Sequence, residues 1–252
     1  MSGFQNRRKV LKALGAASLA LGVPLPVISQ ARGTVVVVGG GFGGASCARY
    51  LAYFAPEMRV VLVEPEKRFI TCPFSNTVLG GLNDISYITH EFTALQRVGV
   101  EVVHSRVKEI QKDKKKIKLS DNSEINYDRL VLSPGIDFHF DRIVGYSEEL
   151  SLEFPHAWKA GKQTTLLRQQ LEKIPNGGVF VMTIPSNPYR CPPGPYERAS
   201  LVAHYFKTFK PRSKILLLDD KDKFSKQPLF MNAWKELYSD IIEWVPFVQK
   251  GN

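Results

Sequence analysis

Cysteine is scarce in this chain, which has three among 252 residues: Cys47, Cys72 and Cys191. The five histidines show no metal-ligand spacing and no C-x-x-C-H motif is present, so neither a metal site nor a haem on this chain is expected. After residue 31, no apolar run approaches the ~20 residues that a membrane-spanning helix needs. No basic and aromatic stripe accompanies the net charge of +10, which argues against nucleic-acid binding.

The N-terminus resembles an export signal. Arg7-Arg8-Lys9 precedes an apolar run at residues 13–23, and small residues follow up to Ala31. This is similar to a twin-arginine signal that is cut after Ala31, with an uncleaved N-terminal anchor as the alternative. Cleavage after Ala31 would remove four basic residues and no acidic residue. The export signal predicts a periplasmic protein.

A glycine motif follows directly, in the segment T-V-V-V-V-G-G-G-F-G-G-A at residues 34–45. An apolar strand breaks there into G-x-G-x-x-G and opens a helix, and an acid ends the next strand twenty residues later. This arrangement predicts a site for an adenine dinucleotide, in which the helix N-terminus binds the pyrophosphate and the acid accepts hydrogen bonds from the ribose. A plain glycine-rich turn is the alternative. The candidate cofactor-binding residues of this segment are Gly39, Gly41, Phe42, Gly43, Gly44 and Glu64.

Alternating apolar and amphipathic segments predict an α/β fold with a doubly wound parallel sheet. The expected strands are 34–38, 60–63, 101–104, 129–132, 179–183, 214–218 and 241–245, and the expected helices are 43–54, 88–98, 199–208 and 232–238. Residues 107–127 read as an antiparallel meander with a solvated lysine hairpin. We expect residues 1–31 to be the signal, 32–153 a Rossmann-type FAD-binding domain, and 154–252 an incomplete second Rossmann-like domain.

The second unit has a proline loop, I-P-S-N-P-Y-R-C-P-P-G-P-Y-E-R at residues 184–198, in place of phosphate-binding glycines. Proline removes N–H donors, so this loop is not suited to cradle pyrophosphate and a pyridine nucleotide is not the expected electron donor. The loop presents Cys191. From spacing alone, Cys72 and Cys191 are either redox-active or structural thiols, while Cys47 on the first helix reads as a packing residue.

Four stretches resemble one family: V-V-V-V-G-G-G-F-G-G-A, T-C-P-F-S-N-T-V-L-G-G from Thr71, P-H-A-W-K-A-G-K-Q-T from Pro155, and R-C-P-P-G-P-Y-E-R-A-S from Arg190. They are similar to the flavoprotein subunit of flavocytochrome c sulfide dehydrogenase, which is related to sulfide:quinone oxidoreductases and to glutathione-reductase-like flavoproteins with two dinucleotide-binding domains. The resemblance covers the chain after the signal but only the N-terminal part of the family's length, so we expect a fragmentary reading frame.

The resemblance implies an FAD that is joined covalently to Cys72 through a thioether. It places Val107 near the adenine, and Pro134 and Gly135 along the flavin or its ribityl chain. It also implies that Cys191 is half of a redox-active disulfide, whose partner lies in the later part of the family chain. Glu197 is then a candidate for handling protons, with a helix-start acid as the alternative.

The implied reaction is oxidation of sulfide to sulfur or polysulfide. Hydrosulfide, favoured by positive charge near Arg190 and Arg198, attacks the disulfide, and electrons pass through the flavin to a c-type cytochrome subunit. Two alternatives stay open at this point: a sulfide:quinone oxidoreductase-like enzyme, or a truncated FAD-binding fragment without catalysis.

Overall fold

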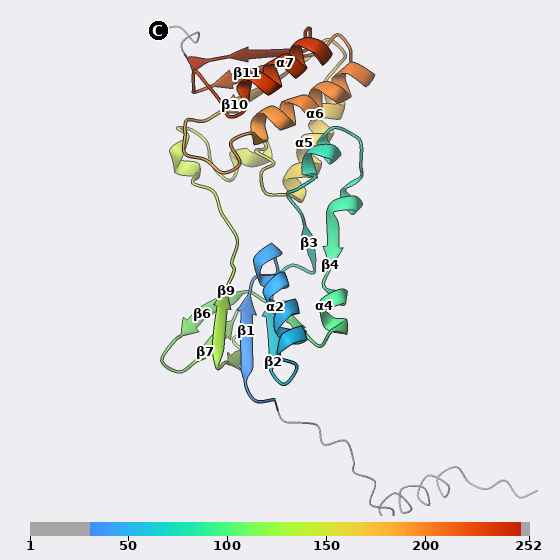
Figure 1. The fold of residues 1–252 in the computed structure, drawn as a ribbon. Helices are drawn as coiled ribbons and strands as arrows, with labels where there is room; N and C mark the ends of the chain where they lie inside the picture. Colours follow the sequence, from blue (N-terminus) through green and yellow to red (C-terminus); the bar gives the residue numbers. More distant parts are fainter. Residues whose placement is uncertain (1–30, 248–252) are drawn as a thin grey trace, which may run out of the picture.

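The computed structural model describes residues 31–247, which form two lobes (Figure 1). The expected signal at residues 1–31 lies, except for its last residue, outside the described residues. The first lobe is built on a four-stranded parallel sheet with the strand order β5-β2-β1-β9. Its strands are β1 (Thr34–Val38), β2 (Arg59–Val63), β5 (Glu101–Val103) and β9 (Arg129–Leu132). The predicted α/β fold with a parallel sheet is confirmed.

Both faces of this sheet are covered, which explains the unbroken apolar runs in its central strands. Alternate residues point to opposite faces. Val35 and Val37 pack with Ala48 of α2 (Phe42–Phe54) on one face. On the other face Val36 packs with Ile117 of β7, and both are fully buried.

The predicted meander is confirmed. It consists of β6 (Val107–Gln111), β7 (Lys116–Leu119) and β8 (Glu124–Asn126), which pair antiparallel in that order. Lys116 forms an ion pair of 2.8 Å with Glu124 across the hairpin. The lysine cluster is thus an exposed hairpin beside a buried β7 face, as the sequence indicated.

The helix predicted near residues 88–98 is only partly correct, because the helix there, α4, covers Thr93–Arg97, while Thr89–Glu91 form the strand β4. Between β2 and β4 the chain also contains β3 (Arg68–Ile70), α3 (Ser75–Leu79) and the 3₁₀ turn η1 (Ile85–Ile88). Thr89 pairs with Ile70 in an antiparallel ribbon, and this long-range pairing overrides the local helical pattern. The ribbon runs between the two lobes in Figure 1 and carries α3 up to the second lobe.

The second lobe has a three-stranded parallel sheet in the order β10-β11-β12. Its strands are β10 (Val179–Ile184), β11 (Lys214–Asp219) and β12 (Ile242–Val245), and its helices are α5 (Lys162–Lys173), α6 (Gly194–Phe209) and α7 (Gln227–Leu237). Helix α6 begins five residues earlier than predicted, and α5 was not predicted. Proline near the start of α6 fits a helix N-terminus, where no N–H partner is needed.

Segments from both halves of the chain build the core of the second lobe. Leu79 of α3 is fully buried there with Leu171 of α5 and Phe206 of α6. Two short 3₁₀ turns, η2 (Phe140–Arg142) and η3 (Leu150–Leu152), lie on the segment that returns from β9 to this lobe. The division of the chain after residue 153 stays a prediction, although α3 packs with elements that follow it.

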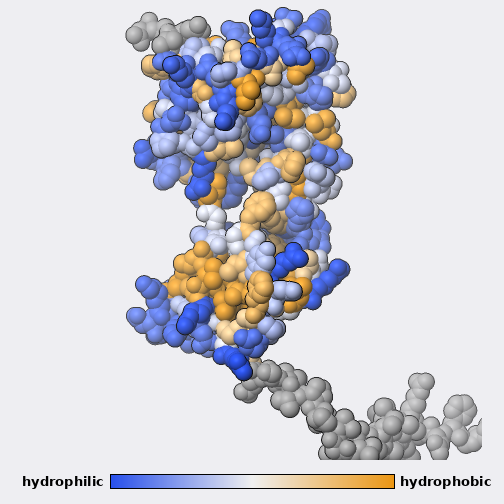
Figure 2. Space-filling model, viewed as in Figure 1, coloured by the Kyte–Doolittle hydropathy of each residue, from blue (hydrophilic) through white to orange (hydrophobic). Residues whose placement is uncertain are grey.

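Apolar side chains gather on the surface of the first lobe, in the lower half of Figure 2. Near its C-terminus helix α2 exposes Tyr50, Tyr53 and Phe54, and the Phe54 ring contacts both tyrosine rings. Contiguous exposed apolar surface marks contact surfaces more often than chance.

Candidate functional site

The glycine turn between β1 and α2 requires glycine at two positions for steric reasons. Gly39 has φ +97°, and a β-carbon there would lie 2.0 Å from the Ser133 carbonyl oxygen. A β-carbon on Gly44 would lie 1.8 Å from the Gly39 carbonyl oxygen. These glycines therefore let the ends of β1, β9 and α2 converge on one point, as the motif predicted.

The N-terminus of α2 is open toward a ligand. Its N-cap, Gly41, provides no side-chain cap, and its first turn contains no acid. A β-carbon on Gly41 would meet only the ring edge of Phe69, at 3.6 Å or more, and one on Gly43 would lie 3.3 Å from Ser133 Oγ. Phe42 is exposed and packs edge-on against Phe69. Free N–H groups with room before them are what a pyrophosphate needs, so these residues fit a dinucleotide.

Glu64 lies beside this turn, at the carboxyl end of β2. Its carboxylate accepts hydrogen bonds from the Gly40 N–H at 2.6 Å and from the Glu66 N–H at 2.9 Å. A carboxylate has about four acceptor sites, so two remain for ribose hydroxyls. The structure thus brings the predicted acid to the glycine turn.

The other predicted cofactor contacts lie at the ends of strands. Val107 begins β6, and Pro134 and Gly135 come one residue after the end of β9. Gly135 has φ +85°, and no atom lies within 4 Å of a β-carbon built on it. Ser133 joins this bend to the glycine turn, because its N–H donates to Val38. The roles of Val107, Pro134 and Gly135 in cofactor binding stay predictions.

A second group of residues surrounds Trp158, in the turn after η3. The Cys72 thiol donates to the Trp158 carbonyl oxygen at 3.4 Å. A β-carbon built on Gly194 would lie 3.3 Å from Cys191 Sγ and 3.3 Å from Trp158 Cζ3, so the sulfur and the edge of the indole ring both flank this glycine. The two predicted redox sulfurs, 119 positions apart in sequence, therefore adjoin one tryptophan.

Arg198 holds this group together from inside the protein. Its guanidinium stacks on the Trp158 ring, 3.5 Å from the centroid. It donates to Asn76 Oδ1 at 3.1 Å, to the His156 carbonyl oxygen at 2.7 Å and to the Ala157 carbonyl oxygen at 2.6 Å. Arg198 is 2% exposed. Burial lowers its pKa to about 9, while charge interactions with the two nearby cysteines act to raise it, so it stays cationic at neutral pH.

His156 in the same turn is neutral. Burial holds the pKa of His156 down to about 4, and the positive charges of Arg198 and Lys159 add to this effect. Its Nδ1 accepts a hydrogen bond of 3.0 Å from the Trp158 N–H, which requires an unprotonated nitrogen. The positive charge beside the cysteines therefore comes from arginine and not from this histidine.

Cys191 is exposed and has φ +55°, a conformation that side-chain-bearing residues rarely adopt. It lies three residues before α6 begins. Glu197 is in the first turn of α6 and is exposed, so its proposed proton-handling role stays a prediction. Cys47 is half-buried on α2 and packs with the first lobe's core, as expected. All three cysteines are free.

Sequence reasoning did not identify the burial of Arg198 or its contacts with Trp158 and Asn76. A signal was available for Arg198: it stands four residues before Val202 and eight before Phe206, which are both fully buried. A charged residue at that helical spacing lies on the apolar stripe of its helix. Such a position predicts a buried arginine that needs several acceptors.

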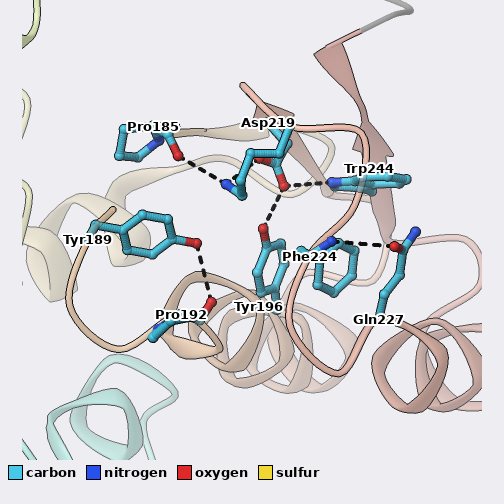
Figure 3. A network of polar contacts seen from close by, with 9 residues as sticks. Pro185, Tyr189, Pro192, Tyr196, Asp219, Phe224, Gln227 and Trp244 are labelled. Carbon is cyan, nitrogen blue, oxygen red and sulfur yellow. Dashed lines mark hydrogen bonds and ion pairs between the residues drawn. The ribbon is translucent and has the colours of Figure 1, made fainter. Parts of the chain in front are cut away.

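The carboxyl end of the second sheet carries a different polar network, shown in Figure 3. Asp219, the last residue of β11, is fully buried. Its carboxylate accepts from the Tyr196 hydroxyl at 2.6 Å, from Trp244 Nε1 at 3.0 Å and from Lys221 Nζ at 2.6 Å. Tyr196 also stacks on Phe224, with ring centroids 3.7 Å apart. In dinucleotide-binding domains an acid at the end of the second strand binds the ribose. Here the carboxylate of Asp219 is bound instead by side chains of the same chain.

We expect Tyr196→Phe to lower the free energy of unfolding by about 1–3 kcal/mol, because it removes a buried donor from a carboxylate. Burial and Asp219 raise the pKa of Tyr196, so its hydroxyl keeps the proton that it donates. Urea unfolding followed by circular dichroism measures the effect. Tyr205→Phe is the matched control, since Tyr205 is buried in the same core but is not a donor to Asp219. Equal losses in both variants would contradict the role of the hydrogen bond.

Residues 31–247 contain neither a candidate metal site nor a candidate membrane span. No group of three or more histidine, cysteine or acidic side chains is placed to hold a metal ion. Within the same residues, every helix is too short or too polar to cross a membrane.

Two family models match the chain. One, described as pyridine nucleotide-disulphide oxidoreductase, matches residues 33–169. The other, described as the central part of the sulfide dehydrogenase [flavocytochrome c] flavoprotein chain, matches residues 164–252. Together they cover both lobes.

Individual proteins agree with these matches. A sulfide dehydrogenase [flavocytochrome c] flavoprotein chain from Chlorobaculum thiosulfatiphilum is 66% identical over 44 residues, which are 18% of this chain and 92% of that sequence. The mitochondrial sulfide:quinone oxidoreductase of Mus musculus is 26% identical over 71% of this chain and 40% of its own length. The solved sulfide:quinone oxidoreductase of Aquifex aeolicus superposes with a TM-score of 0.69 at 18% identity, over 85% of this chain and 51% of that one. The chain thus spans about half or less of these two longer proteins.

Proposed function

The chain belongs to the pyridine nucleotide-disulphide oxidoreductases, in the family of flavocytochrome c sulfide dehydrogenase flavoprotein chains, and from this premise we propose that it serves FAD-dependent oxidation of sulfide. One observation carries the proposal. Two sulfurs from distant parts of the chain adjoin the same tryptophan, in a protein whose first lobe presents an open dinucleotide site. That combination suits a flavin whose reactive end faces a redox cysteine.

The residues present fit FAD. The open N-terminus of α2 would hold the pyrophosphate, and Glu64 would hold the adenosine ribose. Val107 would lie at the adenine, and Pro134 and Gly135 along the ribityl chain and flavin. Bound FAD would supply a two-electron acceptor that can release electrons singly. Exposed Cys72 is the proposed thioether attachment point.

Cys191 is the proposed site of sulfur chemistry. With a second cysteine outside these 252 residues it would form a disulfide. Hydrosulfide attacks one sulfur of this bond, the S–S bond breaks, and the products are one cysteine persulfide and one cysteine thiolate. Glu197, six positions after Cys191 and in contact with solvent, would exchange the protons. Electrons would then leave through the cofactor to a c-type cytochrome subunit.

We also propose export to the periplasm by the twin-arginine pathway, on the Arg7-Arg8 motif. A covalently held cofactor would suit an exported protein, because a lost flavin is not replaced easily outside the cytoplasm. A quinone is the alternative electron acceptor, since sulfide:quinone oxidoreductases are among the similar proteins. Sulfide-dependent reduction of cytochrome c, compared with that of a soluble quinone, distinguishes the two acceptors.

Covalent loading is tested by the intact mass of the denatured protein. We expect a mass increase of one FAD, which Cys72→Ser removes completely because no thiol is left at that position. Cys47→Ser is the control and keeps the increase, since Cys47 packs within the first lobe. A flavin that is released in full on denaturation of the unaltered protein would disprove the thioether.

A further inference from the structure

Arg198 is a buried cation without a carboxylate partner. The ion pairs found within the described part of the chain do not include it, although it is 2% exposed. Its hydrogen-bond acceptors are an amide oxygen and two backbone carbonyl oxygens, all of them neutral. A buried charge without a counter-ion is costly, so its retention in this position requires a reason.

The same side chain contacts every segment that carries a redox sulfur. Asn76 belongs to α3, which begins three residues after Cys72. The 156–158 turn receives the Cys72 thiol's hydrogen bond, and its Trp158 ring flanks Gly194, which Cys191 Sγ also flanks. Arg198 itself is on α6, the helix that Cys191 precedes. Its planar fork fits three acceptors in fixed directions, which a lysine does not do.

The turn that Arg198 binds adopts an unfavourable backbone conformation. Ala157 has φ +49°, and its carbonyl oxygen accepts the shortest of the three hydrogen bonds, at 2.6 Å. Such conformations persist only where the surroundings hold them. The stacked ring of Trp158 and these hydrogen bonds together provide that hold.

We propose that Arg198 is the positioning residue of this site: it holds the Cys72 and Cys191 segments together and leaves its positive charge unneutralised for an anionic sulfur species. The inference rests on the proposed function for the identity of that anion, a hydrosulfide or a sulfur-bound product of it. The charge itself is a property of this chain alone. Arg190, although adjacent to Cys191, is exposed and its charge is screened by water.

The test measures local positive potential at Cys191 in the reduced full-length chain. Iodoacetate and iodoacetamide alkylate the same thiolate, but only iodoacetate is an anion. The ratio of their rate constants, followed at the Cys191 peptide by mass spectrometry, therefore reports the nearby charge and cancels changes in accessibility. We expect Arg198→Gln to lower this ratio about fivefold and Arg198→Lys to keep most of it.

Arg168→Gln is the matched control. Arg168 also stacks on an aromatic ring, that of Tyr205, and also donates to a backbone carbonyl, that of Leu79. Its loss removes a similar structural contact, and we expect no change in the ratio. An equal fall in Arg168→Gln and Arg198→Gln, or no fall in a folded Arg198→Gln, would overturn the proposal.

The unaltered protein provides a second test if Arg198→Gln does not fold. A buried charge is screened little by salt, whereas the field of Arg190 and Lys159 at the surface is screened strongly. We expect the reagent ratio to change little between low and high ionic strength, and a collapse to unity would overturn the role of Arg198. Neither test uses flavin or sulfide, so a positive result beside absent sulfide oxidation would count against the proposed function alone.

Discussion

Replacing Cys191 with serine is expected to reduce sulfide-dependent flavin reduction by at least about a thousandfold while the flavin stays bound. A serine hydroxyl forms no disulfide and no persulfide, so the proposed S–S exchange with hydrosulfide has no substitute. The dinucleotide residues belong to the other lobe, and Cys191 is exposed and lies outside α6, so the fold tolerates this change. Stopped-flow absorbance of the flavin on mixing with sulfide measures the rate.

Cys47→Ser is the control for this experiment, because it removes a thiol that packs on α2 away from the tryptophan group. Its rate of flavin reduction is expected to match that of the unaltered protein. If Cys191→Ser were still reduced by sulfide at an undiminished rate, direct attack on the flavin would replace the cysteine route. The proposed order of events at the two sulfurs would then be wrong.

The first lobe was predictable because its determinants are local. The glycine spacing, the apolar run before it and the acid at the end of β2 all lie within 31 residues, and each has a steric or electrostatic reason that the structure shows. The meander was predictable for the same reason, since its turns are marked by charged residues between short apolar positions. The parallel sheet follows from the alternation of strands and helices, but its order β5-β2-β1-β9 was not predicted.

The segment between β2 and β5 was not predictable from local pattern. Thr89, His90 and Glu91 lack strand character by themselves and become a strand because Arg68, Phe69 and Ile70 lie opposite. The position of α3 likewise depends on a partner far away, the buried Leu171 of α5. The local sequence pattern does not indicate such long-range pairings.

The sequence predicted which cysteines belong to the candidate site, but not how the surrounding residues are arranged. The motifs identified both sulfurs, but nothing in their spacing indicates that both lie near Trp158 or that Arg198 binds the 156–158 turn. The contacts of Arg198 join it to residues that are 40 to 122 positions away. They depend on how the antiparallel ribbon brings α3 to the second lobe.

Substituting alanine for Gly44 is expected to prevent FAD binding and to lower the free energy of unfolding by about 2–4 kcal/mol. The added β-carbon would lie 1.8 Å from the Gly39 carbonyl oxygen. This oxygen belongs to the backbone and cannot move aside by a side-chain rotation. Helix α2 must then move away from β1, and its N–H groups leave the position that a pyrophosphate needs. Thermal unfolding and flavin fluorescence titration measure the two effects.

Gly43→Ala provides a sharp comparison, because Gly43 is the neighbouring residue in the same helical turn. Its β-carbon would lie 3.3 Å from Ser133 Oγ, the end of a side chain that can rotate. Alanine also favours the helix over glycine by ~1 kcal/mol, so the stability of Gly43→Ala is expected to stay within about 1 kcal/mol of the unaltered protein. If both variants lost the same stability, the close approach of α2 to β1 would not be what requires glycine at position 44.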